Sequence, residues 1–308
     1  MNIIKHRYLF FAISLLVIIP GLVALAIWGL DPAIDFTGGS MLEVKFDSGK
    51  APQPAEVFDF LTKAGIADAT VQSSGTDGII IRAKDMTEET KTQLVSDLGT
   101  KFNSSITINT FTSVGPVIGQ EVTKRAFLAV ALAALAIILY ITFAFRGMQH
   151  SFRYGVSAIL AMIHDVLVVV GMEALIGHFG SWEADSMFLT AVLTVIGFSV
   201  HDTIVVYDRI RENSNIYRKI TLTEVVNHSI VQTLARSILT QLTVMLCLLA
   251  MALFGGVTIR HFVTILLIGV FSGTYSSIFN APEILVVWEN REWRHWFHPS
   301  EWKEMIAK

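Results

Sequence analysis

Long apolar runs alternate with polar segments along this chain. The runs extend over about Tyr8 to Leu30, Lys124 to Phe145, Tyr154 to Ile176, Met187 to Tyr207, Ser237 to Phe254 and Phe262 to Trp288. A helix needs about 20 apolar residues to cross a bilayer, so the pattern predicts six membrane-spanning helices. The first run exceeds the roughly 7 to 15 residues of a signal-peptide core, which favours an uncleaved anchor.

The segment between the first two runs has a shorter period. Strand-like alternation covers Met41–Phe46, Ala69–Gln72, Ile79–Ala83 and Ser105–Thr112, and helical spacing covers Pro54–Ala64 and Thr87–Phe102. The resulting order, β-α-β-β-α-β, is that of a ferredoxin-like α+β domain. We therefore expect an α-helical polytopic membrane protein with a ferredoxin-like domain between its first two membrane helices.

Composition agrees with a membrane protein and narrows its chemistry. The chain is 53% hydrophobic and 16% charged, against about 25% charged residues in soluble domains. A net charge of -3 argues against nucleic-acid binding, and a single cysteine excludes an intrachain disulfide and a cysteine-based metal framework. The sequence contains no GxxxxGK[ST] phosphate loop, which is the commonest sign of nucleotide hydrolysis. If the protein drives a transport process, the energy must therefore come from another source. We also predict no cofactor and no enzymatic activity.

Lysine and arginine gather in alternate loops and so predict the orientation. They lie at Arg146 and Arg153, at Arg209, Arg211, Arg218 and Lys219, and in the tail. By the positive-inside rule both termini are cytoplasmic and the domain between the first two helices is external. The chain is therefore predicted to divide into four parts. They are the cytoplasmic N-terminus with the first membrane helix (1–30), the external ferredoxin-like domain (31–122), a bundle of five membrane helices with a cytoplasmic loop over 208–235 (123–288), and a cytoplasmic tail (289–308). A capping box at Thr221 and Glu224 predicts a helix that leads from this loop toward Arg236.

Ionisable residues inside the predicted spans are the candidate functional site, because charges are costly in the membrane. Asp202 lies in the fourth span, and Arg236 stands at the entrance to the fifth. An aspartate near a fixed guanidinium can gain and lose protons, which suits a proton relay. A static pair that joins two helices is the alternative.

Two His-Asp dipeptides extend this hypothesis. His164 and Asp165 lie in the third span, and His201 precedes Asp202 in the fourth. Histidine titrates near neutrality, so these residues are further relay candidates, although a helix-to-helix hydrogen bond is the simpler role for each histidine. Their spacing does not favour a metal site.

Small residues mark other positions. Glycines and serines on the third, fourth and sixth spans allow helices to pack closely: Gly155, Ser157 and Ala161; Gly197 and Ser199; Gly269, Ser272, Gly273, Ser276 and Ser277. At the borders of the external domain, Gly38 and Gly39 and then Gly115 and Pro116 supply either a flexible connection or a hinge.

Six motifs in order resemble those of the SecD/SecF family, specifically its SecF branch of bacterial protein translocase subunits. They are AIDFTGG (33–39), SVGPVIGQEV (113–122), FRG (145–147), HDTIVVYDRIREN (201–213), QTLARSILT (232–240) and GTYSSIF (273–279). Two positions depart from the family's usual pattern: residue 33 is Ala where Gly is common, and residue 201 is His where many members have Asn.

The resemblance implies a subunit related to the RND transporters that works with SecD beside the SecYEG translocon. It implies an inner-membrane location, a translocating preprotein as substrate, contact with membrane lipid, and use of the proton motive force. The relay aspartate of the family matches Asp202 and its arginine matches Arg236. A small-molecule or lipid exporter of the RND type and a purely structural channel subunit are the alternatives that the residues leave open.

Overall fold

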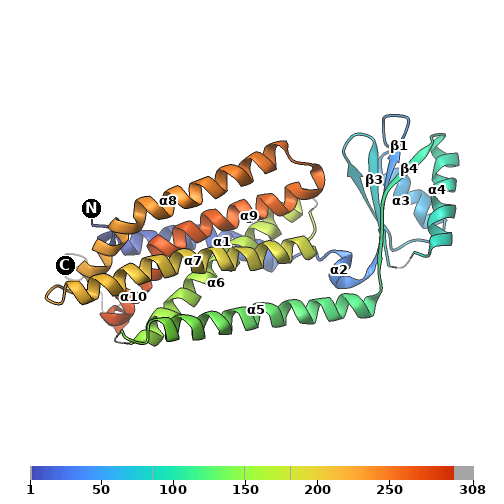
Figure 1. The fold of residues 1–308 in the computed structure, drawn as a ribbon. Coiled ribbons are helices and arrows are strands. Elements are labelled where there is room, and N and C mark those ends of the chain that lie inside the picture. Colours follow the sequence, from blue (N-terminus) through green and yellow to red (C-terminus); the bar gives the residue numbers. More distant parts are fainter. Residues whose placement is uncertain (1, 85, 149, 181, 295–308) are drawn as a thin grey trace. The chain divides into compact units, whose positions relative to one another are not determined.

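The computed structural model describes residues 2–84, 86–148, 150–180 and 182–294, so most of the predicted tail lies outside it. The chain forms two compact units, which are described separately (Figure 1). Unit 1 contains residues 1–30, 128–182 and 187–308, and unit 2 contains residues 31–127 and 183–186. The short segment 183–186 connects two helices of unit 1 but packs as part of unit 2.

Six helical segments are long and apolar enough to cross a membrane, which confirms the predicted number of spans. They are α1 (Arg7–Ile27, preceded by the turn η1, Ile4–His6), α5 (Pro116–Ala144), α6 (Ser151–Gly180), α7 (Ser186–Ile216), α8 (Leu222–Phe254), and a last span built from α9 (Val257–Tyr275), the π-helix η2 (Ser276–Asn280) and α10 (Ala281–Glu289). A final turn, η3 (Glu292–Arg294), follows α10.

Helix α6 packs against both α1 and α9 inside unit 1. Gly21 of α1 and Gly171 of α6 meet so closely that a Cβ atom added at Gly21 would lie 2.8 Å from the Cα of Gly171. Only residues without side chains allow this approach, and neither glycine is among the positions predicted for close packing. Half of the most apolar part of α6 is buried in unit 1, against 6% for α5.

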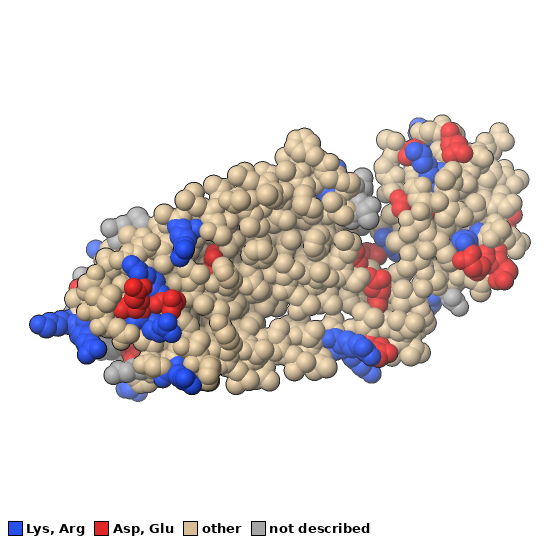
Figure 2. Space-filling view, viewed as in Figure 1, with Lys and Arg blue, Asp and Glu red and all other residues tan. Residues whose placement is uncertain are grey.

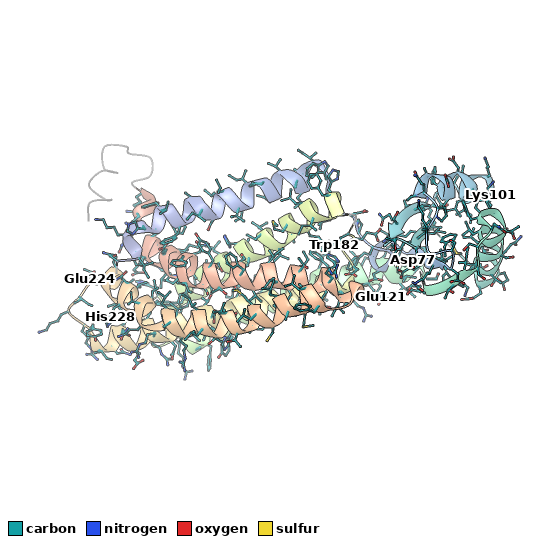
Figure 3. All side chains as sticks on the ribbon, turned by 90° about the horizontal axis from the view of Figure 1, so that it is seen from above. Asp77, Lys101, Glu121, Trp182, Glu224 and His228 are labelled. Atoms are coloured by element: carbon teal, nitrogen blue, oxygen red, sulfur yellow. The ribbon has the colours of Figure 1, made fainter. Side chains whose placement is uncertain are left out.

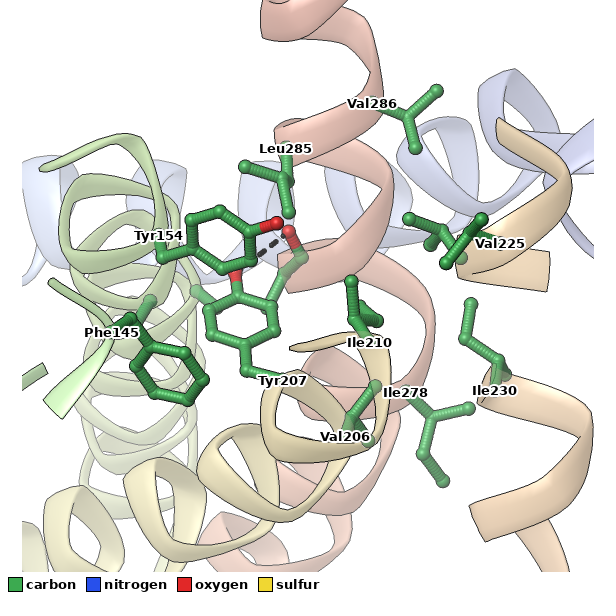
Figure 4. Packing of buried hydrophobic residues seen from close by; sticks show 14 of the residues in the cluster. Phe145, Tyr154, Val206, Tyr207, Ile210, Val225, Ile230, Ile278, Leu285 and Val286 are labelled. Atoms are coloured by element: carbon green, nitrogen blue, oxygen red, sulfur yellow. Dashed lines mark hydrogen bonds between the residues drawn. The ribbon is translucent and has the colours of Figure 1, made fainter. Parts of the chain in front are cut away.

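An aromatic cluster fixes the end of unit 1 where α7 ends and α8 begins (Figure 4). The rings of Tyr154 and Tyr207 meet edge to face at 5.3 Å, and Phe145 stacks on Tyr154 at 5.7 Å. The hydroxyl of Tyr207 donates a hydrogen bond to the carbonyl of Ala281 at 3.1 Å and lies 2.6 Å from the hydroxyl of Ser157. These polar contacts allow two buried tyrosines to join α6, α7 and α10.

Helix α8 is longer than the predicted span because it includes the predicted surface helix. Its capping box is complete: the Thr221 amide donates to Glu224 Oε2 at 2.9 Å, and the Glu224 amide donates to Thr221 Oγ1 at 3.3 Å. The helix continues from this cap to Phe254 without interruption. Residues near Arg236 therefore belong to the same helix as the membrane span.

Unit 2 has the predicted element order. It consists of α2 (Ile34–Thr37), β1 (Gly39–Phe46), α3 (Pro54–Lys63), β2 (Thr70–Ser74), β3 (Gly78–Ala83), α4 (Glu88–Phe102) and β4 (Ile106–Val114). The sheet order is β2-β3-β1-β4, and every neighbouring pair is antiparallel.

Alternation along β1 explains the core of this unit. Leu42, Val44 and Phe46 are buried, and they pack with Val57 and Leu61 of α3 and with Leu94 and Leu98 of α4. Successive side chains of a strand point to opposite faces, so one face of the sheet supports both helices. The apolar alternation in the sequence therefore identifies the buried face correctly.

The glycines at the borders of unit 2 lie against each other. Gly38 has a φ angle of +75°, and a Cβ atom there would lie 2.6 Å from the Cα of Pro116. Gly119 fits as closely, because its added Cβ would lie 2.8 Å from the backbone nitrogen of Gly38. The segments AIDFTGG and SVGPVIGQEV thus form one tight junction, whereas the predicted hinge motion stays a prediction.

A second junction attaches the connection between α6 and α7 to unit 2. Ala184 exchanges backbone hydrogen bonds with Asp31 and Ala33, both at 2.8 Å. Glu183 forms an ion pair with Arg82 at 2.8 Å, and both side chains are largely buried. Burial raises the pKa of Glu183 to about 7, although the charge of Arg82 opposes this rise, and Asp31 and Asp185 add to it.

Substitution of Gly38 by alanine is expected to destabilise unit 2 by more than its unfavourable φ angle alone requires. Gly49 is the matched control, because its φ of +76° is similar but no atom lies within 4 Å of an added Cβ. Gly49→Ala should cost about 1 to 2 kcal/mol, and Gly38→Ala about 1 to 3 kcal/mol more through overlap with Pro116. Hydrogen exchange of β1 amides measures both; equal losses would contradict the close packing.

Docking of the α6–α7 connection is expected to weaken as the pH rises from about 4.5 to about 7. The pKa of Glu183 is raised to about 7 from 4.5, so the docked state favours the protonated carboxyl and loses this preference through that interval. The corrected exchange rate of the Ala184 amide should therefore increase with pH and level off above about 7. Glu183→Gln should remove the dependence and Glu56→Gln, at an exposed position, should retain it; an unchanged profile in Glu183→Gln would refute the assignment.

Candidate functional site

Asp202 lies in α7 inside unit 1 and is 3% exposed. Its Oδ2 accepts a hydrogen bond of 2.8 Å from the side-chain amide of Gln241 on α8. The Nδ1 atom of His201 is 3.8 Å from Oδ1, but this imidazole is mostly exposed. A buried carboxyl group therefore has one neutral donor within hydrogen-bond distance and one distant histidine.

Arg236 does not form the predicted pair with Asp202. It is exposed on α8, and within the part of the chain that the structure describes it has no ion pair. The helix explains this difference, because Gln241 follows Arg236 by five residues and so points about 140° away around the axis. The side of α8 that reaches Asp202 therefore presents an amide, and Arg236 faces out of this chain.

Asp165 is fully buried in α6 at the centre of a set of hydrogen bonds from four groups. Oδ2 accepts from Ser199 of α7 and from Ser276 of η2, each at 2.6 Å, and Oδ1 accepts from Ser272 of α9 at 2.7 Å. The fourth contact is from the adjacent His164, whose Nδ1 is 3.0 Å from Oδ1. Four contacts satisfy a carboxyl group that is 0% exposed, as burial of a charged or polar group requires.

His164 has one ring nitrogen for Asp165 and one without a partner. Its Nε2 atom is buried and has no hydrogen bond with any described residue. The ring lies near that of Tyr275, with centroids 6.2 Å apart. His164 is thus part of the Asp165 cluster, whereas His201 stands at the edge of the Asp202 site.

Ser199 connects the two aspartate sites along α7. It donates to Asp165 and comes three residues before Asp202, so the two side chains lie on neighbouring turns of one helix. No direct hydrogen bond joins Asp165 and Asp202 among the described residues. The structure therefore brings Asp165, His164, Asp202 and His201 into one region and leaves Arg236 outside it.

The hydrogen bonds of the serines and of Gln241 were not predicted from the sequence. Ser199, Ser272 and Ser276 were expected only to allow close packing of helices. Ser272 and Ser276 are four residues apart and so share a helix face, which is the signal that could identify them as a pair of donors. Gln241 has a similar signal, because it is an amide in an otherwise apolar run.

The π-helix η2 contributes to this arrangement. It interrupts the last span at Ser276–Asn280. Ser276 reaches Asp165 from η2, and Asn280 forms a hydrogen bond with Ser14 of α1 at 2.9 Å. A π-helical turn inside an α-helix is often found at functional sites.

Charged side chains leave the middle of unit 1 largely free on the face shown in Figure 2 and gather where α7 ends and α8 begins. Glu224 and His228 mark this end in Figure 3, and Trp182 marks the opposite end. The described residues contain no group of three or more His, Cys, Asp or Glu side chains that could hold a metal ion. The groups at Asp165 and Asp202 are thus carboxyl, hydroxyl, amide and imidazole side chains joined by hydrogen bonds.

Two family models match the sequence. Residues 94–291 match the C-terminal model of the protein export membrane proteins SecD/SecF, and residues 23–50 match the SecD/SecF GG motif. The second match contains Gly38 and Gly39, and the first contains Asp165, Asp202 and Arg236. The matches thus include both the junction of unit 2 and the aspartate sites.

Similar proteins and structures agree with these models. The protein translocase subunit SecF of Anaerolinea thermophila is 56% identical over 96% of this chain and 97% of its own length. The corresponding subunit of Thermobaculum terrenum is 48% identical over 97% and 98%. The crystal structure of SecDF from Thermus thermophilus, described as a translocon-associated membrane protein, matches 94% of this chain with a TM-score of 0.82 and 32% identity.

This chain spans 39% of the solved SecDF chain, so it corresponds to one part of that larger protein. Over that part the two share both the spans and the small sheet domain in one fold. With a relative 56% identical over nearly its whole length and a family model over residues 94–291, the chain belongs to the SecD/SecF family of protein export membrane proteins.

Proposed function

We propose that this chain is an accessory subunit of the Sec protein-export machinery that acts with SecD and uses the proton motive force to assist translocation. The single observation that carries the proposal is the environment of Asp202. This carboxyl group is buried in a membrane-grade helix, and its hydrogen-bond donor is the neutral amide of Gln241. No Lys or Arg of the described residues pairs with it and His201 lies 3.8 Å away, so Asp202 suits the uptake and release of a proton.

The adjacent Asp165 cluster supports a route for that proton. Serine hydroxyls both donate and accept hydrogen bonds, and Ser199 donates to Asp165 one turn of α7 before Asp202, so the proposed route runs past this hydroxyl. Asp165 and His164 are then the next station after Asp202, and His201 is a peripheral group at the edge of the site. In this route the proton is held first by the carboxyl group of Asp202 and then by the side chains of Asp165 and His164.

Arg236 supports a role for a second chain. Its guanidinium always carries a charge, and it lies where the apolar run of α8 begins without an ion pair in the described part of this chain. Exposure of such a charge to lipid is unfavourable, so a partner that supplies a carboxylate is the expected neighbour. SecD is the proposed partner, since the solved relative is a SecDF protein of which this chain matches 39%.

The proposed topology follows from the loop charges. Both termini lie in the cytoplasm, and unit 2, with its ferredoxin-like element order, lies outside the inner membrane. In that position unit 2 can contact a preprotein that leaves the SecYEG translocon. Proton uptake at Asp202 would then be coupled to movement of unit 2 through the helices that connect to it.

Asp202→Asn is expected to abolish gradient-dependent export while the subunit still inserts and assembles with SecD. The asparagine can keep a hydrogen bond with Gln241 but cannot take up a proton. Export of a preprotein into inverted vesicles should be measured with and without a proton gradient. We expect the stimulation by the gradient to fall at least tenfold.

Asp208→Asn is the matched control, because Asp208 lies on the same helix at an exposed position paired with Arg211. It should retain wild-type stimulation. Normal gradient-dependent export by Asp202→Asn would contradict the relay and favour a purely structural subunit. Transport of a dye without an effect on preprotein export would instead favour a small-molecule exporter.

Arg236→Gln should separate the isolated subunit from the complex. Because Arg236 is exposed and unpaired among the described residues, its removal should change the stability of the isolated chain by no more than about 0.5 kcal/mol. In the complex with SecD, the same variant should lose most gradient-dependent export. Thermal unfolding in detergent and the vesicle assay test both parts; full export activity, or a marked loss of stability in the isolated chain, would contradict the proposed location.

A further inference from the structure

Glu173 and His261 form a buried acid-histidine pair that the relay through Asp202 does not use. Glu173 of α6 is 2% exposed, and its Oε2 lies 2.9 Å from Nε2 of His261 on α9. The other oxygen, Oε1, is buried and has no hydrogen bond with a described residue. Trp182 covers the pair, with its ring 4.7 Å from that of His261.

The pair lies on the same two helices as the Asp165 cluster. Glu173 follows Asp165 by eight residues on α6, which is about 12 Å along the helix and about 80° around it. His261 precedes Ser272 by eleven residues on α9, which returns to the same face. The facing sides of α6 and α9 therefore carry two polar sites, Asp165 with Ser272 and Glu173 with His261.

An apolar layer separates these two sites. Val169 of α6, Val195 of α7 and Ile265 of α9 are almost fully buried between them. Gly269 completes the layer, since a Cβ atom there would lie 2.1 Å from a methyl group of Val195. The layer thus places closely packed apolar side chains between the two polar sites.

The ionisable neighbours of the pair along the chain include His178, Arg260 and Glu183. On α6, His178 is stacked on Trp28 of α1 at 4.1 Å. On α9, the neighbouring Arg260 is exposed, and in the following connection Glu183 is paired with Arg82. His261 is thus the group that can exchange a proton with Glu173, and Trp182 limits the access of water.

We propose that Glu173 and His261 form a second proton-binding site, at the end of unit 1 that bears Trp182, and that the layer around Gly269 insulates it from Asp165. The ligand is a proton, held by the carboxyl of Glu173 and exchanged with Nε2 of His261. Trp182 lies at the opposite end of unit 1 from Glu224 and His228 (Figure 3), so the site stands on the other side of the Asp165 cluster from the loop that follows α7. This inference rests on the proposed proton-driven function.

The test uses the chain in complex with SecD, reconstituted into liposomes with an imposed pH gradient. Proton influx is measured for the wild type and for Glu173→Gln, His261→Gln and Asp202→Asn. Glu121→Gln is the matched control, because Glu121 is an exposed carboxylate in α5. We expect Glu173→Gln to lower the influx at least tenfold, His261→Gln to shift the pH of half-maximal influx, and Glu121→Gln to leave both unchanged.

Infrared difference spectra of the purified complex at low and high pH give a readout that does not need transport. The proposal expects Glu173→Gln to remove one protonated-carboxyl band that Glu121→Gln retains. Wild-type influx, pH profile and spectrum in Glu173→Gln and His261→Gln, with influx lost in Asp202→Asn, would overturn the second site and leave the proposed function intact. Influx lost in Glu173→Gln but normal in Asp202→Asn would support the second site and refute the proposed relay.

Discussion

The structure of unit 1 depends on the need to satisfy the carboxylate of Asp165 inside an apolar bundle. Three serine hydroxyls and the ring of His164 reach this one group, and they come from α6, α7, α9 and η2. An uncompensated polar group in this position would cost several kcal/mol, so the four segments are held in one arrangement. The same constraint explains why small residues line these helices, since serines reach a carboxylate only where the backbones approach closely.

Asp165 and Asp202 are both buried, but they differ in the number of hydrogen-bond donors that contact their carboxyl groups. The first has four contacts within 3.0 Å, and the second has one, from Gln241. Each donor that contacts a buried carboxyl group holds its own segment against the others, so Asp165 joins four segments and Asp202 joins two. Ser199 contacts Asp165 one turn before Asp202, so α7 takes part in both sets of contacts.

The sequence predicts the architecture well because periodicity depends on local burial. Apolar runs identify all six spans, and the alternation in β1 identifies the buried face of unit 2. The side-chain partners could not be predicted in the same way, because they depend on the rotation of each helix. A turn of 140° between Arg236 and Gln241 decides which of them meets Asp202. The Glu173–His261 pair was missed for a similar reason: the two residues are 88 positions apart and share no motif.

Two junctions inside unit 2 involve segments that continue into membrane-spanning helices. The connection from α6 to α7 packs as part of unit 2 through Glu183 and Ala184, and Gly38 contacts Pro116 at the beginning of α5. Helices α6 and α7 carry Asp165 and Asp202, so a shift of one helix past the other would act directly on this connection. Since Gly38 leaves no space for a side chain, the AIDFTGG segment and the beginning of α5 pack without a gap inside unit 2. The chain thus enters unit 2 through tightly packed backbone at Gly38 and returns to it at Glu183 and Ala184.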